Sequence, residues 1–203
     1  MLVLAEGEGE SKNIEEDYPL ISEEDLLLFL KSRIGRITGV VISGGEPCLQ
    51  KDLKNFIKKI KKMGFRVKLD TNGTKPELVR DLIKENLLDY IAMDLKSSLS
   101  NYEKAVGVKT DIAKIIESIK LLKESAVPYE FRSTLVPGLH TADDILAMSQ
   151  VIAGADKWFL QKFKSDTNLV DSKLRGQRSF TDLEMKKFLR IAQKYVPNCK
   201  TRD

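Results

Sequence analysis

Residues 40–53 read VVISGGEPCLQKDL, and this stretch decides the fold. The β-branched run from Gly39 to Ser43 predicts a strand, and the glycine pair after it predicts a turn. Pro47 then favours the start of a helix near Leu49. A strand, a glycine turn and a helix in direct succession are typical of a βα unit, so the sequence predicts parallel strands connected by helices.

The same succession recurs along the rest of the chain. Capping residues that precede amphipathic helical runs occur at Ser22, Thr74, Thr110, Thr141 and Thr181. Short β-type runs between them occur at 39–43, 66–71, 90–94, 129–136 and 157–163. Parallel strands need crossover connections of this length, so the sequence predicts an α/β fold with outer helices.

The bulk composition is that of a globular protein. The chain has 203 residues, of which 42% are hydrophobic, and a net charge of +4, which argues against disorder. Its apolar runs are too short to span a bilayer, and no basic segment opens the chain, so we expect a cytoplasmic protein. We expect a single domain over 1–203, with an irregular segment at 1–20 and a C-terminal loop, helix and tail at 165–203. Within that tail, 165–179 is expected to form a mobile loop.

Polar or small residues stand at the end of every predicted strand. Asp94 and Arg132 interrupt otherwise apolar runs, and a buried charge needs a partner or a ligand. In (β/α) barrels the active site lies at the carboxyl ends of the strands, so these residues would surround one mouth. They are Ser43, Gly44, Gly45, Glu46, Asp70, Thr71, Asn72, Asp94, Lys96, Arg132, Thr134, Gln161 and Lys162.

The turn at Gly44, Gly45 and Glu46 carries mainly hydrogen-bond acceptors. Glycine lets the backbone turn tightly and approach a ligand closely. The exposed carbonyl oxygens and the Glu46 carboxylate would then suit a ligand ammonium group. A glycine pair before a helix is also ordinary turn chemistry, so these residues alone leave both interpretations open.

Several motifs in a fixed order carry a resemblance to a known family. They read VVISGGEPCLQKDL at 40–53, VKLDTNGT at 67–74, DYIAMDLK at 89–96 and EFRSTLVPGLHTADDI at 130–145. Together they resemble the radical S-adenosylmethionine (radical SAM) superfamily, and within it the activators of anaerobic ribonucleotide reductase and then those of pyruvate formate-lyase. The resemblance covers about 21–163 and implies a (β/α)6 TIM-like barrel. The barrel would be partial, because no clear first strand precedes Ile21.

The resemblance also implies roles for the residues at the strand ends. Gly44, Gly45 and Glu46, followed by Pro47, would hold the ammonium group of S-adenosylmethionine. Lys96 would reach the cofactor carboxylate or a substrate backbone. The other implied cofactor-binding residues are Asn72, Arg132, Thr134 and Gln161. Asp70, Thr71, Met93 and Asp94 match positions that bind a monovalent cation, and two converging carboxylates would repel each other without one.

Relatives of this kind hold a [4Fe–4S] cluster with three cysteines spaced CxxxCxxC after the first strand. The cluster cleaves S-adenosylmethionine, and the resulting radical takes hydrogen from a glycine of a partner glycyl-radical enzyme. This chain has two cysteines, Cys48 and Cys199, and no such motif. Either Met1 is internal to a longer protein, which we favour because the cofactor-side residues remain, or the chain has lost its cluster. We expect these 203 residues alone to bind no cluster and to perform no radical cleavage.

Other residues have simpler interpretations. His140 is the only histidine, and we expect a loop histidine beside the Thr141 cap, with a catalytic role at the rim as the alternative. Cys48 is expected to be a buried thiol. The lysine-rich run at 51–62 predicts a solvated helix face, with a nucleic-acid contact as the alternative.

Other functional classes also remain open. A cluster-less binding module for S-adenosylmethionine or a protein partner is the main alternative, and calorimetry would test it. A (β/α) barrel lyase or aldolase would use Lys68 or Lys96 as a Schiff-base residue, but no glycine-rich phosphate loop follows the later strands. A missing first strand would leave the strand at 39–43 as an exposed edge, so dimerisation is expected.

Overall fold

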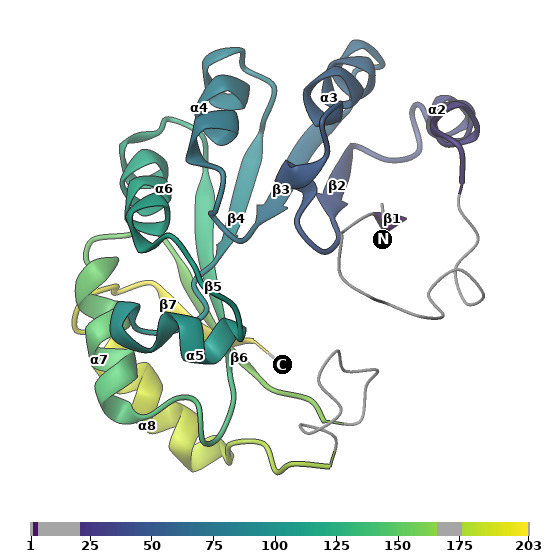
Figure 1. Ribbon diagram of the computed structural model, residues 1–203. Helices are drawn as coiled ribbons and strands as arrows, with labels where there is room; N and C mark the ends of the chain where they lie inside the picture. Colours follow the sequence, from purple (N-terminus) through teal and green to yellow (C-terminus); the bar gives the residue numbers. More distant parts are fainter. Residues whose placement is uncertain (1, 4–20, 166–175, 203) are drawn as a thin grey trace. The chain divides into compact units, whose positions relative to one another are not determined.

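The computed structural model of the protein describes residues 2–3, 21–165 and 176–202 (Figure 1). The segment predicted at 1–20 lies outside these ranges except for 2–3, and so do residues 166–175 of the mobile loop predicted at 165–179. The described residues form two compact units. Unit 1 comprises 2–3, 21–71, 75–92 and 125–128, and unit 2 comprises 72–74, 93–124, 129–165 and 176–202.

Strands and helices alternate as predicted. The strands are β1 (Leu2–Val3), β2 (Gly39–Ser43), β3 (Arg66–Thr71), β4 (Tyr90–Asp94), β5 (Tyr129–Leu135), β6 (Trp158–Lys162) and β7 (Cys199–Arg202). The helices are α2 (Glu23–Ser32), α3 (Leu53–Lys62), α4 (Pro76–Lys84), α5 (Tyr102–Val106), α6 (Ile112–Glu124), α7 (Ala142–Val151) and α8 (Asp182–Ala192). No helix among these described residues is both long and apolar enough to cross a membrane.

The strands follow one another in chain order from β1 to β7. β2 runs parallel to β3, with Val40 beside Val67. In unit 2, β5 runs parallel to β6, and β6 runs parallel to β7. The predicted fold class, α/β with parallel strands and outer helices, is confirmed.

One expectation about the start of the sheet needs correction. We expected no strand ahead of Ile21, but Leu2 and Val3 form β1 and pair in parallel with Ile42 and Ser43 of β2. The apolar residues that open the chain are β-compatible, and an unpaired edge strand offers them backbone partners. Among the described residues, β1 pairs with the last two residues of β2. Dimerisation through this edge therefore stays a prediction.

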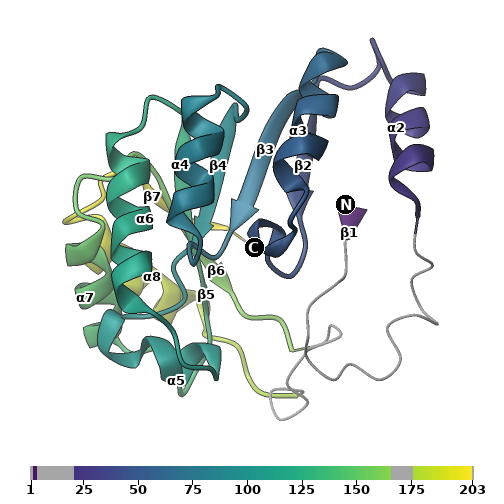
Figure 2. The same cartoon turned by 45° about the horizontal axis from the view of Figure 1, so that its top comes forward.

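In unit 1, α3 packs on β3 (Figure 2). Lys58 pairs with Glu85 at 2.8 Å, and Lys61 pairs with Asp89 at 2.7 Å. These partly exposed ion pairs agree with the predicted solvated face. The side chains of α3 that are buried against the sheet are Leu53, Phe56, Ile57 and Ile60.

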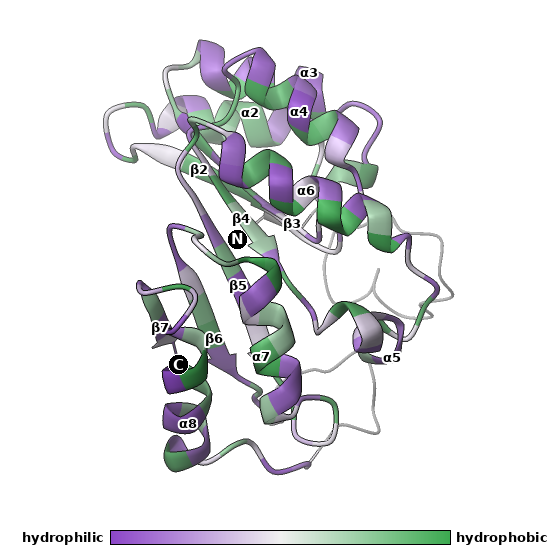
Figure 3. Cartoon of the chain, turned by 90° about the vertical axis from the view of Figure 1, so that its left-hand side faces the viewer, coloured by the Kyte–Doolittle hydropathy of each residue, from purple (hydrophilic) through white to green (hydrophobic). Residues whose placement is uncertain are grey.

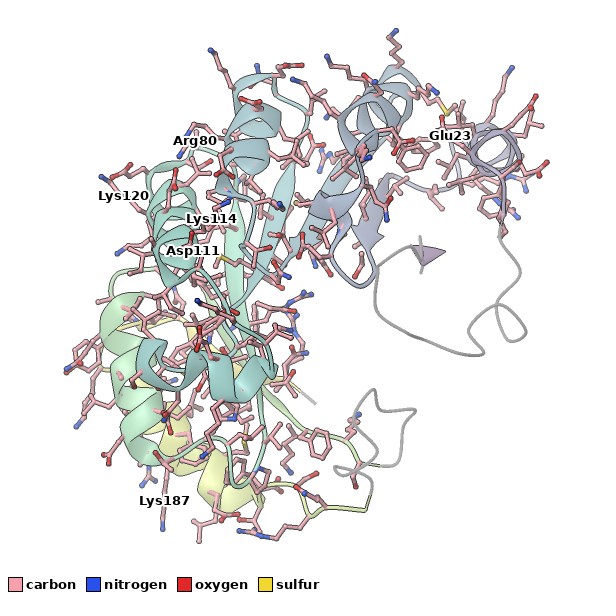
Figure 4. All side chains as sticks on the ribbon, in the orientation of Figure 1. Glu23, Arg80, Asp111, Lys114, Lys120 and Lys187 are labelled. Atoms are coloured by element: carbon pink, nitrogen blue, oxygen red, sulfur yellow. The ribbon has the colours of Figure 1, made fainter. Side chains whose placement is uncertain are left out.

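In unit 2, α7 and α8 lie side by side along β5, β6 and β7 (Figure 1). Hydrophobic and hydrophilic residues are interleaved along α6 and α8 (Figure 3). Lys120 on α6 and Lys187 on α8 extend away from the sheet (Figure 4). Each helix therefore buries one face and exposes the other, as amphipathic periodicity requires.

Helix starts follow the predicted caps in three of five places. Capping boxes form at Thr141 and Thr181, and Ser22 accepts a hydrogen bond from the N–H of Asp25. The prediction for Thr74 was wrong by one residue, since Lys75 is the N-cap and Pro76 opens α4. The run predicted to open at Thr110 starts α6 at Ile112.

The buried hydroxyl of Ser133 links β5, β6 and the segment just after β4 within unit 2. The indole Nε1–H of Trp158 on β6 donates to Ser133 Oγ on β5 at 3.0 Å. Ser133 Oγ in turn donates to the backbone carbonyl of Leu95, just after β4, at 2.7 Å. Trp158 and Leu95 are fully buried, so each polar group here has a partner away from water.

Candidate functional site

The Glu46 carboxylate, in the turn after β2, accepts two hydrogen bonds. Glu46 Oε1 accepts from the N–H of Cys48 at 3.0 Å, which caps the short 3-10 helix Pro47–Leu49. The same oxygen accepts from Thr71 Oγ1, at the end of β3, at 2.9 Å. The helix predicted near Leu49 is thus this single turn, and α3 begins only at Leu53.

The glycines of this turn are not required by backbone strain. Neither Gly44 nor Gly45 is among the glycines with a positive φ, although the chain bends at both positions. A Cβ built on Gly45 would meet no atom within 4 Å. Gly44 and Gly45 are both exposed, so the absence of side chains leaves the backbone open to a ligand.

Cys48 is buried beneath this turn, as predicted. Its side chain is 5% exposed, and Sγ lies 3.7 Å from Thr71 Oγ1. Burial, and then the negative charge of Glu46, raise the pKa of the thiol far above its usual range. A protonated, enclosed thiol is a packing residue, not a nucleophile or a metal ligand.

Asp70 and Thr71 end β3 in unit 1. The Asp70 carboxylate is 12% exposed and lies 3.3 Å from the ammonium of Lys68. Thr71 is buried. The other two candidates for a cation site, Met93 and Asp94, belong to unit 2.

Asp94 of unit 2 binds two cationic side chains. Its Oδ1 accepts from Nε of Arg132 and also contacts NH2 of Arg132, each at 2.9 Å. Its Oδ2 accepts from Nζ of Lys96 at 2.9 Å. The expected acidic partner of Arg132 is therefore Asp94. The three side chains remain 29%, 16% and 43% exposed in the order Asp94, Arg132, Lys96, so solvent or a ligand can still reach them.

Asn72 and Met93 shape the turn after β3. Asn72 Oδ1 accepts from the N–H and the hydroxyl of Thr74, at 2.9 Å and 2.7 Å, which is an Asx turn. The next residue, Gly73, has φ +80°, and the Met93 side chain fills the space beside it. The Asn72 carbonyl oxygen is thus committed to the turn.

Thr134 and Gln161 lie side by side, since the register of β5 and β6 pairs them. Arg132 and Thr134 share one face of β5 because strand side chains alternate. Arg202 on β7 pairs with Gln161 in register, and sequence reasoning missed it. Its guanidinium lies 3.7 Å from the centre of the Phe159 ring and 3.2 Å from Glu130. The alternating tail at 199–202 was the only local signal for this strand.

His140 is a buried residue of unit 2 and is 4% exposed. Its Nδ1 accepts from the N–H of Val136 at 3.0 Å, and its Nε2 lies 2.8 Å from the carbonyl oxygen of Lys96. Both nitrogens therefore contact backbone. His140 precedes the Thr141 cap as expected, but it is buried.

Two buried hydroxyls near this cluster lack partners. Ser97 Oγ and Tyr102 OH have no hydrogen-bond partner among the described residues. Burial raises the pKa of Tyr102 to about 12; the Lys96 backbone partly offsets that rise, and the Asp94 charge adds to it.

A family model for the radical SAM superfamily matches residues 9–149. The chain belongs to the radical SAM superfamily. A protein of Methanocaldococcus jannaschii, provisionally named a glycyl-radical enzyme activating enzyme, is 35% identical to this radical SAM chain over 164 residues. The match spans 78% of this chain and 68% of the relative.

Solved structures have the same fold. A domain of pyruvate-formate lyase-activating enzyme from Bacteroides vulgatus superposes with a TM-score of 0.63 at 18% identity, covering 82% of this chain and 100% of that domain. Streptococcus suis SuiB bound to its precursor peptide superposes with a TM-score of 0.70 at 15% identity, covering 92% of this chain and 43% of SuiB. At such identities these structures support the radical SAM fold alone. The predicted resemblance to glycyl-radical activating enzymes is confirmed.

Proposed function

We propose that this radical SAM chain binds S-adenosylmethionine and is of the type that activates glycyl-radical enzymes. The observation that carries the proposal is the Asp94 cluster, in which one carboxylate holds Lys96 and Arg132 at 2.9 Å. Such an anchored pair of cations is a ready partner for a second carboxylate. The family and the 35% identity to the M. jannaschii relative support the choice of ligand and reaction type.

The proposed contacts with the amino-acid end of the ligand are of two kinds. The backbone carbonyls of Gly44 and Gly45 and the Glu46 carboxylate would accept hydrogen bonds from its ammonium group. Lys96 and Arg132 would donate to its carboxylate. Pro47 would stiffen the turn that carries Glu46. The remaining proposed contacts are Asn72, Thr134 and Gln161.

A monovalent cation beside the ligand is part of the proposal. Hard cations prefer oxygen ligands. The candidate ligands are the Asp94 carboxylate and the Met93 main-chain oxygen of unit 2, and the Asp70 carboxylate and the Thr71 main-chain oxygen of unit 1. The affinity for S-adenosylmethionine should then be higher in potassium chloride than in tetramethylammonium chloride at equal ionic strength. An equal affinity in the two salts would remove the cation from the proposal.

S-adenosylmethionine bound to a [4Fe–4S] cluster supplies the radical that removes hydrogen from a glycine. The residues of this chain do not fit such a cluster. Cys48 and Cys199 are both buried, and no group of three or more His, Cys, Asp or Glu side chains among the described residues could hold a metal. Residues 4–20, which follow β1, contain no cysteine. We therefore propose that these 203 residues alone bind S-adenosylmethionine without cleaving it.

Isothermal titration calorimetry with S-adenosylmethionine tests the binding site. The wild-type chain should bind. Lys96→Met should weaken binding by about tenfold or more, because a hydrogen bond to a charged group contributes about 1.5–3 kcal/mol. Lys104→Met is the matched control, since Lys104 is an exposed lysine of α5 in the same unit. Absence of binding by the wild type, or an equal loss in both variants, would refute the proposal.

The cluster proposal needs a separate test. The chain is incubated anaerobically with iron and sulfide, desalted, and then mixed with dithionite and S-adenosylmethionine. We expect no stoichiometric cluster absorbance and no 5′-deoxyadenosine on chromatography. A stoichiometric cluster would overturn the cluster-less interpretation and leave the S-adenosylmethionine site intact.

The proposed partner is a glycyl-radical enzyme, with anaerobic ribonucleotide reductase as the first candidate. A synthetic peptide that carries the glycine loop of that enzyme should bind the chain in the presence of S-adenosylmethionine. A scrambled peptide of the same composition is the control. Equal binding of the two peptides would exclude this partner.

A further inference from the structure

The single histidine of the chain lies where it can control the position of Lys96. His140 is buried and follows β5 by a tight turn, in which the N–H groups of Leu139 and His140 both donate to the carbonyl of Val136, at 3.1 Å and 3.0 Å. Gly138 makes this turn possible with φ +85°. The turn brings the imidazole back onto the N–H of Val136 and across to the carbonyl of Lys96.

The contacts of the ring define its tautomer. The N–H of Val136 points at Nδ1 at 3.0 Å, so Nδ1 must accept and carries no proton. The proton is therefore on Nε2, which donates to the Lys96 carbonyl oxygen at 2.8 Å. Nδ1 also lies 3.3 Å from the Val136 carbonyl oxygen. That oxygen already accepts two backbone N–H groups, so it does not require a proton from Nδ1.

The backbone that leads into Lys96 is held at both polar groups of Leu95. The N–H of Leu95 donates to the carbonyl of Arg132 at 2.8 Å, and the carbonyl of Leu95 accepts from Ser133 Oγ at 2.7 Å. The Lys96 carbonyl lies two residues past the end of β4 and is held by His140. The Lys96 side chain returns from this point to Asp94 Oδ2.

We propose that His140 is a positioning residue that fixes the Lys96 peptide and so directs the Lys96 ammonium toward the bound ligand. This inference rests on the proposed binding of S-adenosylmethionine. The imidazole of His140 contacts the backbone groups of Val136 and Lys96, so it acts on the Lys96 ammonium through the backbone. Without its Nε2–H, the carbonyl of Lys96 turns to water, and the ammonium samples directions away from Asp94.

Two near-isosteric variants separate the two hydrogen bonds of the ring. Glutamine reaches as far as Nε2, so His140→Gln retains a donor for the Lys96 carbonyl. Asparagine matches Nδ1, so His140→Asn retains an acceptor for the Val136 N–H but does not reach Lys96. Both replace a buried ring by a smaller amide, and both should lower the melting temperature by a similar amount. Only His140→Asn should also weaken ligand binding.

Calorimetric titration with S-adenosylmethionine gives the test. His140→Asn should weaken binding by roughly 2- to 10-fold, the range expected for one hydrogen bond, while His140→Gln stays near the wild-type affinity. The effect should vanish in the Lys96→Met background, because the double-mutant cycle removes the residue through which His140 acts. Equal affinities of the Asn and Gln variants, or a full effect of His140→Asn in the Lys96→Met background, would overturn the inference.

Failure of the inference is distinguishable from failure of the proposed function. If the wild type does not bind S-adenosylmethionine, the proposed function is refuted. If it binds and the variants behave alike, only the role of His140 is refuted.

A measurement on the wild-type chain covers the case in which neither variant folds. Because the chain has one histidine, its imidazole nitrogens give one set of signals in a long-range 1H–15N spectrum. We expect the Nε2–H tautomer and a shift of its signal on addition of S-adenosylmethionine; a different tautomer or an unmoved signal would contradict the inference.

Discussion

Replacement of Gly73 by alanine should destabilise unit 2 by more than backbone geometry alone explains. Gly73 has φ +80°, and a Cβ there would lie 2.2 Å from Cε and 3.0 Å from Sδ of Met93. A non-glycine residue in the left-handed region costs about 1–2 kcal/mol. Forcing a methyl group into filled space costs about 1–3 kcal/mol more. The free energy of unfolding should therefore fall by about 2–5 kcal/mol.

Gly107→Ala supplies the matched control in the same unit. Gly107 has φ +76°, but a Cβ there would meet no atom within 4 Å. This variant should lose only the backbone contribution of about 1–2 kcal/mol. The difference between the two variants then measures the clash with Met93 by itself.

Urea unfolding followed by circular dichroism measures both losses, and an unchanged m-value would confirm that the denatured state is the same. The clash also bears on the proposed cation site, because Met93 would supply a main-chain oxygen there. If Gly73→Ala and Gly107→Ala lose the same free energy, the Met93 side chain moves aside without cost and the packing argument is wrong.

Three further predictions concern buried polar groups. Burial by itself would raise the pKa of Asp144, but hydrogen bonds from Ser98, Thr141 and Asn101 outweigh it and lower the pKa to about 2. The carboxylate therefore stabilises the fold at pH values above the unfolded pKa of about 3.9, and this contribution is lost as the pH falls toward 2. Asp144→Asn should be less stable than wild type in urea at pH 6, and the gap should narrow near pH 3; a constant gap would contradict this. Trp158→Phe removes one buried hydrogen bond and should cost about 1–3 kcal/mol in the same assay, and a neutral result would show that Ser133 finds another partner. Burial raises the pKa of Cys48, and raises that of Cys199 to about 12, so both thiols should resist iodoacetamide at pH 8 until the chain is unfolded, and fast native labelling of either would show that it is accessible.

Local patterns allowed the fold to be predicted from the sequence. The boxes at Thr141 and Thr181 formed because their partners lie within one helical turn, where sequence spacing fixes geometry. The prediction for Thr74 failed because its hydroxyl donates to Asn72 Oδ1 in an Asx turn instead of capping α4. A capping pattern in the sequence does not show that a neighbouring side chain competes for the same hydroxyl. β1 was missed since two apolar residues are too few to show a periodicity.

The candidate site was predictable only in part. The resemblance placed Glu46, Asp94 and Lys96 at strand ends, but it could not show that Asp94 holds both Lys96 and Arg132. Those contacts depend on side-chain directions across separate strands. His140 was expected to be a loop histidine beside the Thr141 cap, but its burial was not expected. Its bond to the carbonyl of Lys96 spans 44 residues, and no local rule gives such a partner.

The hydroxyl of Ser133 also decides which alignment of the strands the chain can accept. A slip of β5 by one residue would carry every side chain to the opposite face. Ser133 would then leave both the Trp158 indole and the Leu95 carbonyl, and these two buried groups would lose their partners at a cost of about 1–3 kcal/mol each. A misaligned intermediate of unit 2 is therefore less stable than the correctly aligned one, because it lacks both hydrogen bonds of the Ser133 hydroxyl. This single oxygen atom thus favours the correct strand pairing while the protein folds.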